Sequence, residues 1–263
     1  MKQLLSIEFT KLKKLNSLKI LLFCYIGIVP LLMFAIDYFL RQTPELKVLI
    51  GDADFFQFPL IWKLTAFSAS FVNILLCVSV VIITCNEIHF KTMRQNVIDG
   101  LSKRQVIISK FLIVVLFSLL VTLYTFVVSF IFGLINGGTD QLFEGIDFVF
   151  RYFLQTLGYF SFAFLFALLL RKPALAIILF IAYFPVEFIL QLFVGKSIYQ
   201  FFPLKSFADM TPVPFGGIFV QAAEKQSGQE IWVMSTEWHY VVAAIYIALF
   251  FGFSYFILRK RDL

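Results

Sequence analysis

The sequence predicts an all-α membrane protein with six transmembrane helices in a single domain, residues 1–263. Hydrophobic residues make up 60 % of the chain, 36 residues are Phe, and only 14 % carry charge. A soluble protein of this length needs a larger polar share to cover its surface. The formal charge of +6 falls in short basic clusters between long apolar runs. Such clusters flank membrane spans, so they indicate orientation in a bilayer rather than binding to nucleic acid.

Six largely uncharged stretches approach the length that crosses a bilayer. A helix rises about 1.5 Å per residue, so about 20 residues cross the roughly 30 Å hydrocarbon core. Only the tight turn at Arg171-Lys172-Pro173 separates the fourth and fifth stretches, which predicts a helical hairpin. The first stretch is too long for a signal peptide and lacks a small-residue cleavage site, so we expect an uncleaved span. The predicted spans are residues 18–40, 64–85, 111–135, 151–170, 173–194 and 239–258.

The distribution of Lys and Arg predicts the orientation of these spans. With the N-terminus inside, 15 of the 22 basic residues fall on the inner side. They cluster before the first span, between the second and third, at Arg171-Lys172 and at Arg259-Lys260-Arg261. Because positive residues near span ends are retained in the cytoplasm, we expect both termini to be cytoplasmic.

Residues 1–17 form a separate element ahead of the first span. Its apolar residues occupy one broad arc of a helix and its polar residues the opposite arc. Such an amphipathic helix lies flat on a membrane surface. A simple cytoplasmic extension of the first span is the alternative. The apolar arc comprises Leu4, Leu5, Ile7, Phe9, Leu12 and Leu15.

The connection between the second and third spans contains a predicted short helix, residues 87–101. Asp99-Gly100 marks its end, because Gly commonly follows the last residue of a helix. Ser102, followed three residues later by Gln105, forms a capping box that starts the next helix. A helix held between two spans can pass motion from a cytoplasmic partner to the bundle. A plain connecting loop is the alternative.

The same connection resembles the corresponding segment of type 2 ABC exporter permeases. In that family a Glu after the second span is followed by Gly-Thr, an apolar pair, a Ser-Arg-like doublet and a Lys. Here Lys91 replaces the usual Gly, Gly100 stands where Pro is common, and Lys103 separates the doublet. The layout is similar too, with a flat N-terminal helix, six spans and the longest outer loop between the last two. The matching positions are Glu87, Lys91-Thr92, Val97-Ile98, Ser102 with Arg104, and Lys110.

The resemblance implies a permease subunit of an ATP-binding cassette exporter that is not itself an enzyme. It would dimerise with a second copy or a paralogue in the bacterial inner membrane and contact separate ATPase subunits through the cytoplasmic coupling helix. ATP and Mg would be bound by those ATPase partners, and this chain would hold no cofactor or metal. The implied coupling residues are Glu87, Thr92, Arg94, Ser102, Arg104 and Lys110.

Three polar residues within the predicted spans are candidates for a substrate pathway. A charged carboxylate at the bilayer centre costs about 2.5–3.5 kcal/mol, so Glu187 needs a partner, a proton or water. Pro185 is expected to bend the helix just before it, and Gln191 lies one turn later on the same face. If the fifth span ends early, Glu187 instead faces water at the interface. Asn73 lies in the middle of the second span, where a hydrogen bond between helices is the commoner role.

The outer segment, residues 195–238, is unusually apolar for a loop. It contains Phe201-Phe202-Pro203 and Pro212-Val213-Pro214. The resemblance implies short re-entrant or interfacial helices here that cap a central cavity. The alternative is an amphipathic surface helix anchored at the interface by Trp232 and Trp238.

Two other function classes remain as alternatives: an intramembrane enzyme, and a membrane component of a sensor or immunity complex. An enzyme needs acids, nucleophiles or metal ligands that converge at one depth. The two histidines, His89 and His239, are predicted on opposite sides of the membrane, and no paired carboxylate motif lies within a span. The sequence contains no long coiled coil that would serve as an output element. The three cysteines fall in apolar runs and are expected to be packing residues: Cys24, Cys77 and Cys85.

Overall fold

The computed structural model describes residues 11–13, 15–42, 56–137, 141–214, 216 and 235–260. Over these residues the fold is helical, without a strand. Six helices are long and apolar enough to cross a membrane, which confirms the predicted fold class and marks the chain as a multi-pass membrane protein. They are α2 (Asn16–Gln42), α4 (Leu60–His89), α6 (Lys103–Gly137), α7 (Asp147–Leu170), α8 (Pro173–Leu190) and α12 (Thr236–Lys260).

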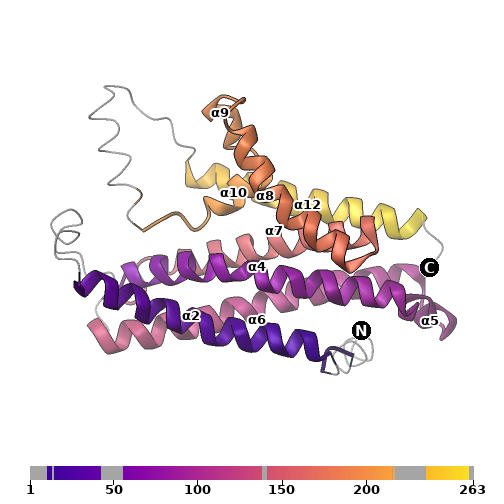
Figure 1. The fold of residues 1–263 in the computed structure, drawn as a ribbon, viewed down its shortest axis with the longest axis horizontal. Helices are drawn as coiled ribbons and strands as arrows, with labels where there is room; N and C mark the ends of the chain where they lie inside the picture. Colours follow the sequence, from indigo (N-terminus) through magenta and orange to yellow (C-terminus); the bar gives the residue numbers. More distant parts are fainter. Residues whose placement is uncertain are drawn as a thin grey trace.

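The long helices run alternately up and down the bundle, as successive membrane spans must (Figure 1). The start of α2 and the end of α12 lie at the same end as the short helix α5 (Thr92–Ile98). α8 leaves this end after a tight turn and diverges from the bundle at a steep angle (Figure 1). The predicted hairpin of the fourth and fifth spans is therefore present, with its two arms splayed.

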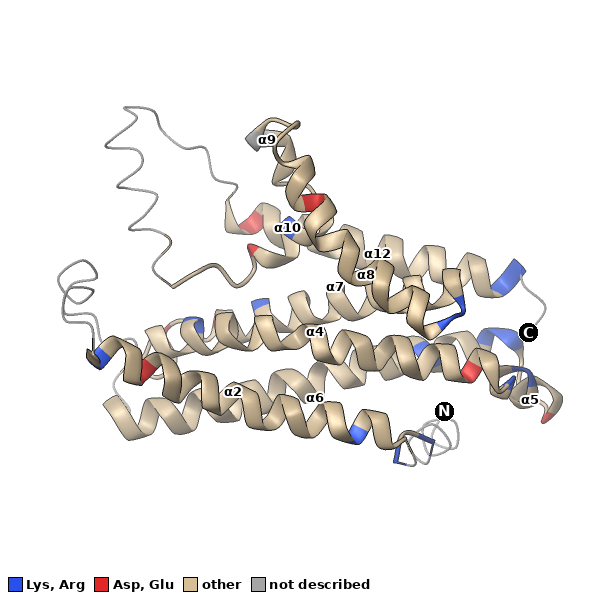
Figure 2. Ribbon diagram, in the orientation of Figure 1, with Lys and Arg blue, Asp and Glu red and all other residues tan. Residues whose placement is uncertain are grey.

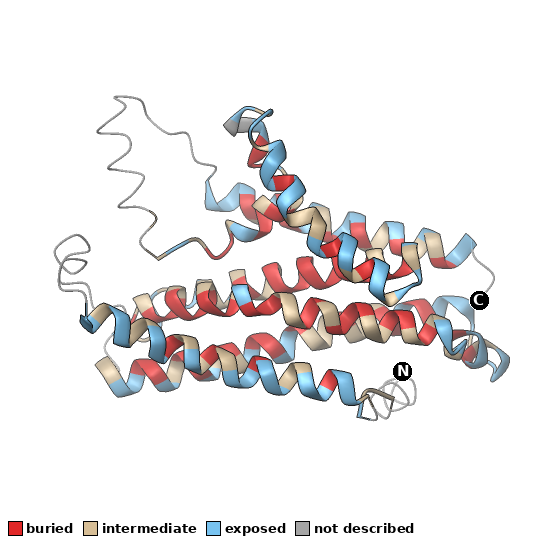
Figure 3. Cartoon of the chain, viewed as in Figure 1, coloured by how far each residue is buried: buried red, intermediate tan, exposed pale blue. Residues whose placement is uncertain are grey.

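α7 is the central helix of the bundle. It packs against α4, α6, α8, α10 and α12, and it is the most extensively buried of the six long helices. The outer helices bury one face and leave the other exposed (Figure 3). Many of the exposed residues are large and apolar. In water such apolar surface would drive aggregation, whereas in a bilayer it contacts lipid.

The helices extend beyond several of the spans that hydropathy predicted. α4 begins at Leu60 rather than at residue 64, and α6 begins at Lys103 rather than at residue 111. Uncharged length measures only the part of a helix within hydrocarbon, whereas helical hydrogen bonding continues into the polar zone. α8 differs in the other direction, because it ends at Leu190 rather than at residue 194.

Two further short helices follow α8: α9 (Lys196–Tyr199) and α10 (Pro203–Ala208). α10 packs against α7 and α12, so its segment folds back onto the bundle. Of the predicted N-terminal helix, residues 1–10 and 14 lie outside the described residues, and residues 11–13 are helical. Residues 217–234, including Trp232, also lie outside them.

Candidate functional site

α5 is a seven-residue helix set between the end of α4 and the start of α6. Its N-cap, Lys91, has a left-handed backbone with φ of 52°, a conformation that costs a non-Gly residue about 1–2 kcal/mol. This is the position at which the resembling family carries Gly. The Thr92 hydroxyl donates a 3.3 Å hydrogen bond to the backbone carbonyl of Glu87, which ties the first turn of α5 to α4.

The end of α5 and the start of α6 are fixed by two local motifs that the sequence predicted. The amide of Leu101 bonds to the Asn96 carbonyl and that of Gly100 to the Val97 carbonyl, which is the Schellman pattern. Gly100 has φ of 102°, in the region that favours glycine.

The predicted capping box at the start of α6 is also present. The amide of Gln105 donates to the Ser102 hydroxyl at 3.3 Å, and the amide of Ser102 donates to the Gln105 side chain at 2.9 Å. Both hydrogen bonds satisfy donors that a helix start would otherwise leave open. The segment from the end of α4 through α5 to the start of α6, called the α5 corner below, thus has a defined backbone geometry at both ends of α5.

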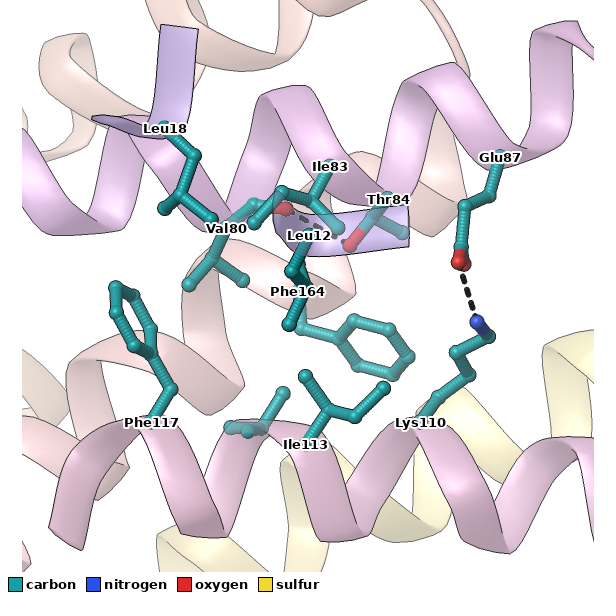
Figure 4. A pocket seen from close by; sticks show the side chains of 11 residues that line it. Leu12, Leu18, Val80, Ile83, Thr84, Glu87, Lys110, Ile113, Phe117 and Phe164 are labelled. Carbon is teal, nitrogen blue, oxygen red and sulfur yellow. Dashed lines mark hydrogen bonds and ion pairs between the residues drawn. The ribbon is translucent and has the colours of Figure 1, made fainter. Parts of the chain in front are cut away.

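Glu87 and Lys110 form an ion pair between α4 and α6 beside this corner. The Lys110 ammonium lies 2.5 Å from Glu87 Oε1, and the two side chains are only 5 % and 9 % exposed (Figure 4). Loss of one partner from a buried pair typically costs about 3–5 kcal/mol, since the other charge is then uncompensated. Glu87 therefore holds α5 through its carbonyl and α6 through its carboxylate.

A cavity of about 40 Å³ lies next to the ion pair (Figure 4). Its walls are mainly apolar, with Thr84 and the ion pair as the polar groups. This volume is sufficient for water, and the walls offer few polar groups. The lining residues are Leu12, Leu18, Val80, Ile83, Thr84, Glu87, Lys110, Ile113, Val114, Phe117 and Phe164.

The remaining predicted coupling residues, Arg94, Ser102 and Arg104, are exposed on the same end of the bundle. Figure 2 shows that Lys and Arg are concentrated at this end, near α5 and the end of α12. The six predicted coupling residues thus divide into three that are buried or half-buried at the corner, Glu87, Thr92 and Lys110, and three that are exposed.

Asn73 is fully buried between α4 and α7, where its side-chain amide donates a 2.9 Å hydrogen bond to the Thr156 hydroxyl. The structure thus places it in an interhelical hydrogen bond. A related contact joins three helices nearby, where the Tyr25 hydroxyl lies 2.6 Å from that of Tyr152 and 3.1 Å from that of Thr125. Sequence reasoning missed Tyr25, because an aromatic residue in an apolar run carries no sign of its polar partner.

Glu187 is also buried, and its partners include two backbone amides of α10. Its carboxylate accepts hydrogen bonds from the amides of Leu204 at 3.2 Å and Lys205 at 2.7 Å. These are the second and third residues of α10, so Glu187 caps the N-terminus of that helix from α8, where the helix dipole favours a negative charge. Gln191 lies one residue past the end of α8 and is half-buried. The structure does not bring Asn73 and Glu187 into contact.

At the other end of α10, Asp209 connects the helix to α12. The Asp209 carboxylate pairs with Lys205 within the helix and lies 3.4 Å from Nε2 of His239. Burial raises the pKa of Asp209, but the His239 hydrogen bond and the Lys205 charge outweigh it, so the pKa lies below its ordinary value. His89 ends α4 and His239 lies in the first turn of α12, at opposite ends of the bundle as predicted.

The described part of the chain contains no cluster of three or more His, Cys, Asp or Glu residues that could hold a metal ion. A family model described as a protein of unknown function, DUF2705, matches residues 31–263. No curated protein and no solved structure matches the chain. The matched range includes the α5 corner and the α8–α10 segment, but its description assigns no activity to either.

Proposed function

We propose that this chain, which belongs to the DUF2705 family of proteins of unknown function, is the membrane-spanning permease subunit of an ATP-binding cassette exporter. The α5 corner is the observation that carries the proposal. A short helix lies across one end of the bundle, with a buried ion pair behind it and exposed basic residues around it. Force applied to such a helix moves α4 and α6 together.

The distribution of charge supports the placement of α5 in the cytoplasm. The end of the bundle that carries α5 also carries the concentration of Lys and Arg, which is the arrangement that the positive-inside rule associates with the cytoplasmic face (Figure 2). A partner ATPase would dock there, with Arg94 and Arg104 as exposed contacts. ATP and Mg belong to that partner, and a second copy or a paralogue of this chain completes the permease.

Affinity purification of the tagged chain in mild detergent, followed by mass spectrometry and an ATPase assay, tests the proposal. We expect an ATP-binding cassette ATPase to co-purify, and Arg94→Glu/Arg104→Glu to lower its yield about tenfold or more, since reversed charges at an interface repel. Arg259→Glu is the matched control, because Arg259 is an exposed cation in the last turn of α12 rather than on α5 or at the start of α6.

Absence of any nucleotide-binding protein, both in detergent and in nanodiscs, would refute the exporter assignment. Equal loss of the ATPase in the α5 variant and in Arg259→Glu would leave the assignment standing but reject α5 as the docking element. Exposed residues are used because substitutions at Glu87 or Lys110 would disturb the fold itself.

A further inference from the structure

Two cations, Lys63 and Arg151, lie close together at the end of the bundle opposite α5. Lys63 is in the first turn of α4 and Arg151 in the first turns of α7. Both lie over the ring of Phe148, with the Lys63 ammonium 5.7 Å and the Arg151 guanidinium carbon 4.5 Å from its centroid. Two positive charges that share one aromatic neighbour repel each other, and an anion beside them offsets that repulsion.

The protein itself supplies only part of the acceptors that these cations require. The Lys63 ammonium donates to the Pro214 carbonyl at a long 3.5 Å, and in the described structure no carboxylate pairs with it. Arg151 pairs with Asp147 through Nη2 at 2.5 Å. Its Nε is buried and has no hydrogen-bond partner among the described residues. Among the described residues, these two positive charges thus have one carboxylate partner, Asp147.

The surroundings place these cations at the depth of lipid headgroups. Tyr240, in the first turns of α12, lies beside Arg151, with its ring centroid 5.9 Å from the guanidinium carbon. Trp238, two residues earlier in the same turn of α12, is exposed. Tyr and Trp gather where the hydrocarbon core meets the polar zone, so the aromatic residues mark that boundary. The starts of α4 and α7 add the positive ends of two helix dipoles.

We propose that Lys63 and Arg151 bind the phosphate group of a phospholipid at this end of the bundle. The guanidinium supplies a forked donor and the ammonium a point charge, which together match the tetrahedral oxygens of a phosphate. The lipid tails would lie along the exposed apolar surface that adjoins the site. This assignment does not depend on the exporter proposal, because it concerns the bilayer that surrounds any multi-pass protein.

Titration of the purified full chain with dioleoyl phosphatidylglycerol, followed by native mass spectrometry, tests the site. We expect Lys63→Ala/Arg151→Ala to weaken lipid binding about tenfold or more, since two charge-assisted contacts are lost. Arg151→Lys keeps the charge but loses the forked donor, so its lipid affinity should fall between those of the wild type and the double variant. Arg41→Ala is the matched control, because Arg41 is an exposed cation at the same end that pairs with Asp37. It should change affinity less than about twofold.

Inorganic phosphate, added at constant ionic strength against chloride, distinguishes a headgroup from free phosphate. A phospholipid site predicts no shift of the melting temperature with phosphate alone. A shift with phosphate that the double variant abolishes, together with equal lipid binding in all variants, would reject the lipid as ligand. Equal lipid binding without any phosphate effect would overturn the site altogether. Lys63→Gln and Arg151→Gln replace the alanine variants if those fail to fold.

Discussion

The ring of Phe207, on α10, lies so close to Gly158, on α7, that a Cβ at Gly158 would be 2.1 Å from Cε1 of Phe207. Phe207 is fully buried, and three atoms of its ring would lie within 2.5 Å of that Cβ. We expect Gly158→Ala to push α10 off α7 and to destabilise the fold by about 1–3 kcal/mol, the usual cost of overpacking. Equilibrium unfolding in mixed detergent micelles measures this loss.

Gly252→Ala provides the control for Gly158→Ala. Gly252 lies within α12, and nothing is within 4 Å of the position that its Cβ would take. Because Ala favours a helix over Gly by about 1 kcal/mol, this variant should be neutral or stabilising. Addition of Phe207→Leu should recover part of the stability lost in Gly158→Ala, and equal losses with and without it would contradict the proposed clash.

The cap that Glu187 provides to α10 predicts a change in hydrogen exchange. Glu187→Ala removes the acceptor of the Leu204 and Lys205 amides, and a lost cap costs about 0.5–2 kcal/mol. Exchange at these two amides should therefore accelerate by up to about thirtyfold. Gln191→Ala, one turn along the same face, is the control and should leave both amides protected. Unchanged protection in Glu187→Ala would show that α10 is held by its packing alone.

A double-mutant cycle tests the buried pair of Glu87 and Lys110. Glu87→Leu and Lys110→Met should each lower the free energy of unfolding by about 3–5 kcal/mol, whereas the double variant should lose much less. The exposed pair of Asp37 and Arg41 offers a matched cycle, in which we expect coupling of about 0.5 kcal/mol or less. Additive losses at Glu87 and Lys110 would mean that the pair is not formed in the bilayer.

Stability at acidic pH should depend on Asp209. Its pKa is lower in the folded protein than in the unfolded chain, so the stability it contributes is fully present above the unfolded value of about 3.9. That contribution is lost as pH falls through the folded pKa. Melting temperatures from pH 6 to pH 3 should thus fall more steeply for the wild type than for Asp209→Asn. Asp37→Asn, which removes a carboxylate from an exposed pair, is the control, and parallel curves for all three proteins would contradict the prediction.

Features that depend on neighbours in the sequence could be predicted. The six spans follow from uncharged length, and the Schellman end at Gly100 and the capping box at Ser102 each involve residues within five positions of one another. The physical causes act locally, so local sequence carries them. Glu187 was singled out in the same way, as a carboxylate in a span that needs a partner, whereas Glu87 and Lys110 were named as coupling residues that the resemblance implies.

The partners of those groups could not be predicted, because they depend on how the helices pack. Glu87 and Lys110 are 23 positions apart, and their pairing requires α4 and α6 to meet in one register. Glu187 accepts hydrogen bonds from two backbone amides of α10. Every residue except Pro has such an amide, so the sequence does not identify these two donors. The hydroxyl of Tyr25 is hidden in the same way within an otherwise apolar run.

α8 differs from the other long helices in how little of it the protein covers. Three of its residues are buried, Ala176, Phe180 and Glu187, while α7 beside it is covered along most of its length. Displacement of α8 exchanges few protein contacts for lipid contacts of similar strength, whereas displacement of α7 would open the core. Thermal motion of the bundle should therefore be largest in α8. The helix would pivot at the turn at Arg171-Lys172, and the hydrogen bonds from α10 to Glu187 would restrain it.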